Sequence, residues 1–289
     1  MEFRTREIIC DSRSTRFDII PLSCIHVGPK AFDKDKFRKA VKRIKDNPLA
    51  LWFSIGDNFD GINRSDKRFD GGEVDPEVCP NFESLDELAE NQLDWLVSET
   101  ECIADKCLGV GCGNHEETLR IRYHTNIHKR YYKHIGSLSN YCTPETCDLG
   151  YSGILRLKFA RSTTTRNLKI NYFHGKGGGG GEQQLDQMAL EQPNCDIYAI
   201  GHLHILKAQQ KKTVDIAEQS DSFVESTRIY IQAGTFLRTK MQSARTYSEV
   251  KGHKMSALGC TVIRAIPHHE EGKKYEFYEN CEGLPPLVK

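Results

Sequence analysis

The segment Leu49–Asn58, LALWFSIGDN, joins an uninterrupted apolar run to a glycine followed by two polar residues. The run Leu49–Ile55 predicts a buried strand. Polar residues directly after such a strand lie at its carboxyl end, where sheets of α/β proteins generally place their sites. The segment therefore predicts an α/β fold and makes Asp57 the first candidate site residue.

Four further segments end an apolar run in the same way. The runs are residues 17–22, 107–111, 168–173 and 197–200. The polar endings that follow them are Cys24-Ile25-His26, Gly113-Asn114-His115-Glu116, His174-Gly175 and Gly201-His202-Leu203-His204. Apolar residues at helical spacing occupy 34–47 and 84–105 between the runs, and Pro48 closes the first of these helices. This alternation of strand and helix predicts a sheet whose strands all deliver chemistry at one edge.

The chain of 289 residues fits one large domain, and we expect residues 1–289 to form it. Its last part, 228–289, is rich in strand-like runs such as RIYIQAG, CTVIRAI and YEFY. This part either completes a second sheet or caps the site, and the sequence leaves both placements open.

Charge and cysteine content limit the classes of protein to which the chain can belong. Lysine plus arginine equals aspartate plus glutamate, 40 each, which disfavours a strong overall attraction to nucleic acid or anionic membranes. The 11 cysteines, the absence of an apolar leader at the first residues and the absence of a membrane-length apolar run favour a soluble cytoplasmic protein with free thiols. We expect no membrane partner, and the oligomeric state stays open.

The residue types at the five endings suit a two-metal phosphoesterase. Hydrolysis of a phosphate ester needs an activated water, neutralised phosphoryl oxygens and a proton for the leaving group, and two divalent metals supply the first two. Asp57 is the candidate carboxylate that bridges both ions, Asn114 offers an amide oxygen, and His115 is free to act as general acid. Four histidines offer imidazole ligands, and such ligands suit manganese, iron, zinc or nickel. They are His26, His174, His202 and His204.

In these motifs the chain resembles the calcineurin-like metallophosphoesterases, over residues 17 to 207. The resemblance implies a sandwich of two mixed β-sheets flanked by helices. It implies a first metal held by Cys24, His26, Asp57 and His204, and a second held by Asp57, Asn114, His174 and His202. It also implies that His115 lies over the scissile phosphate with Asp60 as its orienting partner. A narrower likeness, to phosphoesterases of bacteriophages and prophages, lies in Ala31–Asp33, Asp66–Asp70, the glycine tract after His174 and the region of Tyr247 and Glu249.

Cys24 stands where this family has an aspartate. Its thiolate would be a good ligand for zinc or iron. Alternatively the thiol stays protonated and packs at the strand end, so that the first metal binds weakly. We expect two divalent ions, manganese first with iron, zinc or nickel as alternatives, and Cys24 puts the first site in question.

Two segments bear on the substrate. Residues 120–134 (RIRYHTNIHKRYYKH) interleave basic residues with tyrosines, a composition typical of nucleic-acid surfaces, although a solvated amphipathic helix would have the same pattern. The tract after Lys176, five glycines, offers either backbone N–H groups for an anion or a flexible loop. We take Arg120, Arg122 and Lys176 as candidate substrate-binding residues. The remaining histidines, His124, His128, His134, His253, His268 and His269, are expected to be solvated.

The sequence therefore predicts a metal-dependent phosphodiesterase in which a metal-bound hydroxide attacks phosphorus, with DNA as the first substrate. A small-nucleotide phosphodiesterase or phosphomonoesterase is the alternative. A third hypothesis, from another class, is a catalytically weak nucleic-acid-binding or assembly module, which Cys24 favours and His115 disfavours.

Overall fold

The computed structural model describes most of the chain. The described residues are 1–62, 66, 69–80, 87–177, 180–216, 222–242, 246, 249, 255–270, 272–278 and 280–281. Several predicted features therefore lie partly or wholly outside them: the start of the 84–105 helix, two glycines of the tract, His253, Tyr247 and parts of the 228–289 region.

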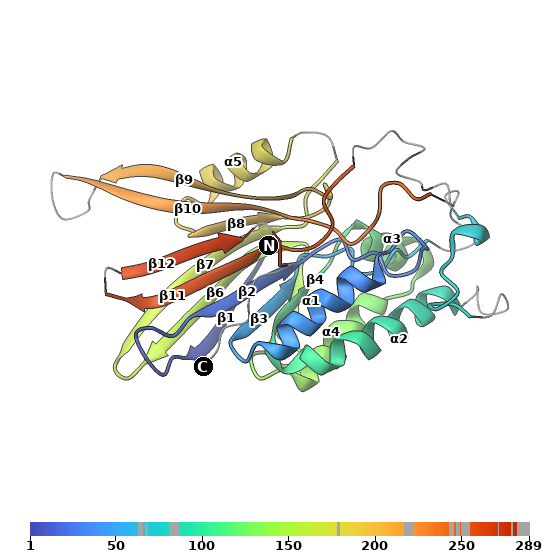
Figure 1. The fold of residues 1–289 in the computed structure, drawn as a ribbon, viewed down its shortest axis with the longest axis horizontal. Helices are drawn as coiled ribbons and strands as arrows, with labels where there is room; N and C mark the ends of the chain where they lie inside the picture. The colour runs from blue at the N-terminus through green and yellow to red at the C-terminus, as the bar shows by residue number, and fades with distance from the viewer. Residues whose placement is uncertain are drawn as a thin grey trace.

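Two six-stranded sheets pack face to face (Figure 1). In spatial order the first sheet contains β1 (Glu2–Ile9), β6 (Ser152–Arg161), β7 (Thr164–Phe173), β8 (Ile197–Ile200), β10 (Phe223–Ala233) and β9 (Leu206–Ile216). The second contains β12 (Gly272–Tyr278), β11 (Val262–His269), β2 (Phe17–Leu22), β3 (Ala50–Ser54), β4 (Cys107–Gly111) and β5 (Asp148–Gly150). Each sheet mixes parallel and antiparallel pairs, for example β2 with β3 and β2 with β11.

Buried apolar side chains from both sheets form the core between them. Helices cover the two outer faces. Against the second sheet lie α1 (Lys34–Asp46), α2 (Leu88–Thr100), α4 (Ile127–Leu138) and the short α3 (Asn114–Tyr123), while α5 (Gly181–Glu191) packs on β8 and β10 of the first (Figure 1). This arrangement confirms the predicted sandwich of two mixed sheets flanked by helices. Among the described residues, no helix is long and apolar enough to cross a membrane.

The apolar runs became strands close to the predicted limits, and β2, β4 and β8 match them residue for residue. The 84–105 segment is not one α-helix, because it changes at Glu101 to a 3-10 helix, η3 (Glu101–Lys106). Just before this point the Thr100 hydroxyl donates to the Leu96 carbonyl at 2.7 Å, and such side-chain bonds compete with regular helix bonding.

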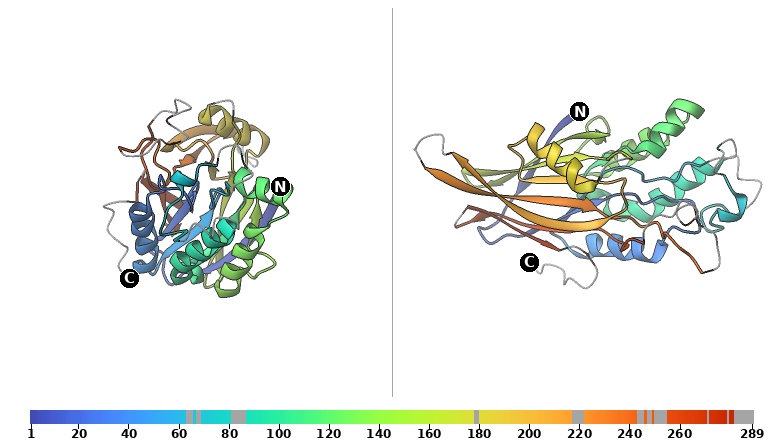
Figure 2. Two further views of the ribbon diagram at one scale, coloured as in Figure 1. Left: turned by 90° about the vertical axis from the view of Figure 1, so that its right-hand side faces the viewer. Right: turned by 90° about the horizontal axis from the view of Figure 1, so that it is seen from above.

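The order of the strands explains why distant segments share one edge. β2, β3 and β4 are parallel neighbours, and so are β7 and β8 in the facing sheet. Their carboxyl ends lie at one end of the sandwich. The turn of the hairpin formed by β9 and β10 lies at the opposite end (Figures 1 and 2). The tail region contributes to both sheets, with β10 in the first and β11 and β12 in the second.

Candidate metal centre

The side chains predicted as metal ligands converge where β2, β3, β4, β7 and β8 end. Three groups each bring their donor atoms within 4.8 Å of one another. These groups are Cys24, His26 and His204; His26, Asp57 and His115; and Asp57, His174 and His202. Asn114 joins the last group, since its Oδ1 lies 3.1 Å from His174 Nε2. The structure thus brings together all seven candidate ligands.

The ligands reach this geometry through an unusual backbone. Of the seven described non-glycine residues with positive φ, five are candidate ligands: Cys24, His26, Asp57, His202 and His204, with φ between 49° and 61°. Side chains disfavour this left-handed region, and such conformations concentrate at functional sites. The conformation also explains how His202 and His204 serve one site, because in a regular strand they would point to opposite faces.

Asp57 lies at the centre, wholly buried. Its Oδ2 is 3.1 Å from His174 Nε2 and 3.7 Å from His26 Nε2, and its Oδ1 accepts the backbone N–H of His115 at 3.0 Å. Burial alone would raise the pKa of this carboxyl, but the imidazoles of His174 and His115 hold the pKa well below its ordinary value. One charged carboxylate therefore faces histidines on both sides.

The histidines turn ring nitrogens toward this carboxylate. His174 Nδ1 lies 2.9 Å from the Ile55 carbonyl, to which it donates, so that Nε2 turns toward Asp57 and Asn114. On the other side, His26 Nε2 and His204 Nε2 lie 3.0 Å apart. Burial, and then the neighbouring imidazoles of His174 and His26 respectively, lower the pKa of His202 and that of His204 below the ordinary value. Neutral imidazole is the form that binds metal.

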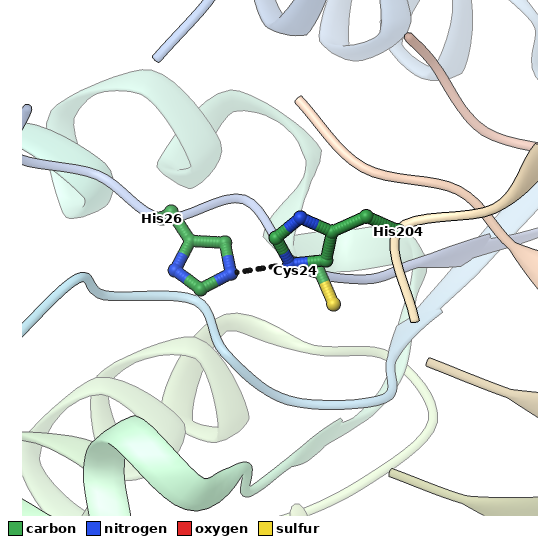
Figure 3. A group of neighbouring side chains, drawn as sticks. All are labelled: Cys24, His26 and His204. Atoms are coloured by element: carbon green, nitrogen blue, oxygen red, sulfur yellow. Dashed lines mark hydrogen bonds between the residues drawn. The ribbon is translucent and has the colours of Figure 1, made fainter. Parts of the chain in front are cut away.

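Cys24 completes the side of His26 and His204 (Figure 3). The residue is wholly buried, and burial followed by the charge of Asp57 raises the pKa of its thiol. Its sulfur accepts the backbone N–H of His202 at 3.1 Å and lies 3.4 Å from Ser23 Oγ. The sulfur therefore lies among the converging donor atoms, at a distance from which it could bind a metal.

Glu116 holds the loops in place, a role that the sequence did not indicate. The buried carboxylate accepts four backbone N–H groups, those of Asp57, Asn58, Phe59 and Gly113, at 2.6–3.3 Å. The contact between these loops is close enough that a Cβ at Gly113 would lie 2.2 Å from Asp57 Oδ1. Glu116 thereby fixes the position of Asp57 relative to the start of α3.

His115 lies beside the ligands. Its ring stands edge-on to that of His26, with centroids 4.7 Å apart. Its Nδ1 donates to the backbone carbonyl of Asp60, while the Asp60 carboxylate is 3.9 Å from that nitrogen and 3.7 Å from His26 Nδ1. Asp60 is thus the neighbour of His115, as expected, but makes the contact through its main chain.

The donor set fits divalent cations. His174 Nε2 lies 3.1 Å from both Asp57 Oδ2 and Asn114 Oδ1, and a cation could bind between such nitrogen and oxygen donors. In addition, two buried ring nitrogens of the described part, His26 Nδ1 and His202 Nδ1, have no hydrogen-bond partner. A donor set rich in imidazoles suits manganese, iron, zinc or nickel better than magnesium.

A cavity of about 630 Å³ adjoins the centre. Its wall combines the ligands with apolar side chains, Ile62, Phe69, Val74, Leu88 and Leu237. Arg238 is the one lysine or arginine among the described residues that line it. The guanidinium pairs with Asp33, whose Oδ2 accepts Nε at 3.1 Å and Nη2 at 2.9 Å. No local signal marks Arg238 in the sequence, because its place depends on the pairing of Leu237 with the distant Phe32.

The residues predicted to bind substrate lie outside the large cavity or next to its wall. Arg120 lines a separate cavity of about 230 Å³ and pairs with Glu117 at 2.7 Å, while Arg122 is exposed on α3. Lys176 is exposed beside Gly177, which does line the large cavity. Of the tyrosines in 120–134, Tyr131 is 1% exposed and belongs to the core, so it forms no part of a surface for nucleic acid.

Two histidines that were expected to be solvated are buried. His128 pairs with Asp148 at 3.0 Å, and His268 Nε2 donates to the Phe159 carbonyl at 2.9 Å. His268 satisfies the buried Phe159 carbonyl, as buried polar groups of a fold usually require, whereas His128 pairs with a partly exposed carboxylate.

No protein-family model matches the sequence, and no curated protein matches it. Among solved structures, GAP50 of Plasmodium, titled the anchor in the inner membrane complex, aligns over 93% of this chain and 86% of its own, with 12% identity and a TM-score of 0.45. Vps29 of Entamoeba histolytica complexed with zinc aligns over 91% and 98%, with 11% identity and a TM-score of 0.37. The NAD nucleotidase NadN of Haemophilus influenzae aligns over 91% and 49%, with 7% identity and a TM-score of 0.38. At these levels of similarity, the functional argument rests on the side chains of this chain.

Proposed function

We propose that this chain is a metal-dependent phosphoesterase. The observation that carries the proposal is the position of Asp57, whose single oxygen Oδ2 faces His174 on one side and His26 on the other. A carboxylate between two sets of neutral donors is the arrangement of a two-metal hydrolytic site. Cys24, His26, Asp57 and His204 would hold one cation, and Asp57, Asn114, His174 and His202 the other.

Two cations, when bound, supply the activation of water and the neutralisation of phosphoryl oxygens that ester hydrolysis needs. The chain itself supplies the proton for the leaving group. Because His115 Nδ1 is held by the Asp60 carbonyl, Nε2 is the nitrogen left to carry that proton. Glu116 holds Asp57 and the start of α3 at fixed positions relative to each other, so that the metal ligands and His115 can act on the same phosphorus.

The cavity favours a small organic phosphate ester over DNA. Its volume falls within the range of ordinary small-molecule pockets, and apolar side chains such as Phe69 and Leu88 suit an uncharged or aromatic leaving group. Arg238 is placed to meet one anionic group. A DNA backbone would instead require several cations along a groove, and the basic segment expected to provide them packs Tyr131 inward and pairs Arg120 with Glu117.

The proposal is tested with metal-stripped protein resupplied with manganese, zinc, iron or nickel. Bis(p-nitrophenyl) phosphate and p-nitrophenyl phosphate should be hydrolysed in at least one metal, and Asp57→Asn should remove most of the turnover. Binding of DNA without turnover in every metal would instead support the binding module.

The salt dependence of turnover distinguishes a DNA substrate from a small ester. Turnover of a DNA substrate should fall steeply between 50 and 200 mM salt, as binding through many phosphates requires, whereas turnover of a small ester should change little. Efficient, steeply salt-dependent cleavage of DNA would overturn the preference for small esters and leave the phosphoesterase itself intact.

A further inference from the structure

We infer that Cys24 binds the cation on the β2 side through its sulfur, as a thiolate, and that this half of the centre selects zinc over manganese. The inference rests on the metal centre of the proposed function and extends it to the identity of one metal. It concerns the position at which this chain departs from the aspartate of the family that it resembles.

The first support is placement. Cys24 Sγ, His26 and His204 offer one donor atom each, all within 4.8 Å, and Figure 3 shows the rings of His26 and His204 facing each other with Cys24 beside His204. Cys24 adopts a φ of 49°, in a region that a non-glycine residue enters only when its surroundings enforce it. Its own carbonyl accepts the Thr235 hydroxyl at 2.9 Å and the Phe236 N–H at 3.1 Å, bonds that hold the residue in this conformation.

The second support is the pattern of hydrogen bonds at the sulfur. The His202 backbone N–H points at Sγ from 3.1 Å, so the sulfur acts as an acceptor. An N–H donor favours the charged form of the group that accepts it. Ser23 Oγ, at 3.4 Å, can donate as well. Both contacts suit a thiolate, because each can donate a hydrogen bond to the sulfur.

The third support is electrostatic. A thiolate at a fully buried position next to the Asp57 carboxylate would be costly without a compensating positive charge. The groups that contact the sulfur, the His202 backbone N–H and the Ser23 hydroxyl, are uncharged and do not supply it. A divalent cation between Sγ, His26 and His204 would supply that charge.

The binding step balances without any change of oxidation state. The S–H bond of Cys24 breaks, its proton leaves to solvent, and the sulfur donates its electron pair to the cation. A soft thiolate with imidazoles suits zinc, whereas manganese favours carboxylate and water ligands and binds most weakly of the divalent series.

Cobalt(II), a spectroscopic substitute for zinc, gives the direct test. Metal-stripped protein titrated with cobalt should develop a sulfur-to-cobalt charge-transfer band in the near ultraviolet. Cys24→Ser should abolish the band and weaken zinc binding by more than the roughly 10- to 100-fold that loss of an outer partner costs. Cys24→Asp should also lack the band, but should bind manganese more tightly than the natural chain does.

Cys102→Ser is the matched control, because Cys102 is the one exposed thiol of the eleven and the first to bind metal adventitiously. It should keep the full band. X-ray absorption of the natural zinc-loaded chain needs no substitution and should show a sulfur neighbour at about 2.3 Å.

A full band in folded Cys24→Ser, or zinc without a sulfur neighbour in the natural chain, would overturn the inference. Neither readout depends on turnover. A sulfur-ligated metal in a protein that hydrolyses no ester would refute the proposed function alone, and a manganese enzyme without the sulfur contact would refute the inference alone.

Discussion

The two halves of the centre differ in the kind of donor that they offer. Beside the shared Asp57, the β7 side offers the amide oxygen of Asn114 and the ring of His174, which is anchored by the Ile55 carbonyl. The β2 side offers the sulfur of Cys24, which accepts the His202 N–H, together with the rings of His26 and His204. Because oxygen and imidazole donors suit several divalent ions whereas a thiolate prefers zinc, the β7 half should bind a range of divalent ions and the β2 half should be selective.

Asp57 belongs to both halves, and its replacement should have the largest effect. Asp57→Asn keeps the shape but removes the charge that faces His174 and His26. We expect loss of both cations by elemental analysis and a fall in turnover of at least the roughly 10²–10³-fold that one oriented electrostatic group contributes. Retention of two tightly bound ions would mean that the halves do not share this carboxylate.

His115 acts on the substrate and not on the metals, so His115→Ala should separate binding from chemistry. Metal content should be unchanged, while kcat/KM falls by roughly 10²–10⁴-fold for an ester with a poor leaving group. The loss should be much smaller for p-nitrophenyl esters that leave without a proton. An equal loss for both leaving groups would contradict the role of His115 as proton donor.

Glu116 connects the halves through the backbone, and Glu116→Gln should weaken both moderately. The amide cannot accept all four N–H groups, which should cost about 1–3 kcal/mol in the free energy of unfolding, measured with urea. Metal affinity should fall about 10- to 100-fold. Glu117→Gln, at the partly exposed neighbour that pairs with Arg120, is the control and should change neither quantity.

The smallest effect is expected at the cavity wall. Arg238→Gln should raise KM up to about fivefold with kcat unchanged, since Arg238 is partly exposed and such charged contacts are worth at most about 1 kcal/mol. Arg120→Gln is the matched comparison and should leave both constants as they are, because Arg120 lines the other cavity. A raised KM in Arg120→Gln with no change in Arg238→Gln would instead indicate that the substrate binds on the α3 side.

The sequence predicted the parts of this site that depend on short-range signals. Apolar runs placed the ends of β2, β4 and β8, and the polar residues that follow them are the converging donors. The strands β1 and β9 were missed because they consist mostly of charged and polar residues, with few buried positions among those described. The likeness to phage phosphoesterases stays a prediction, and Tyr247 lies outside the described residues.

Features that depend on contacts between distant segments could not be predicted. Glu116 receives its N–H groups from residues nearly 60 positions earlier, and the left-handed backbone of His202 and His204 exists only in the assembled site. The burial of Tyr131, by contrast, was readable, since Ile127, Tyr131 and Ile135 share one face of α4. The surrounding basic residues drew attention to a nucleic-acid surface instead.

The most direct test of the central claim is to titrate metal-stripped protein with zinc while following the hydrolysis of bis(p-nitrophenyl) phosphate. The two-cation centre predicts little turnover at one equivalent and a plateau that is reached at two. Full turnover in the absence of metal, or none at any ratio of zinc, manganese, iron or nickel to folded protein, would contradict it.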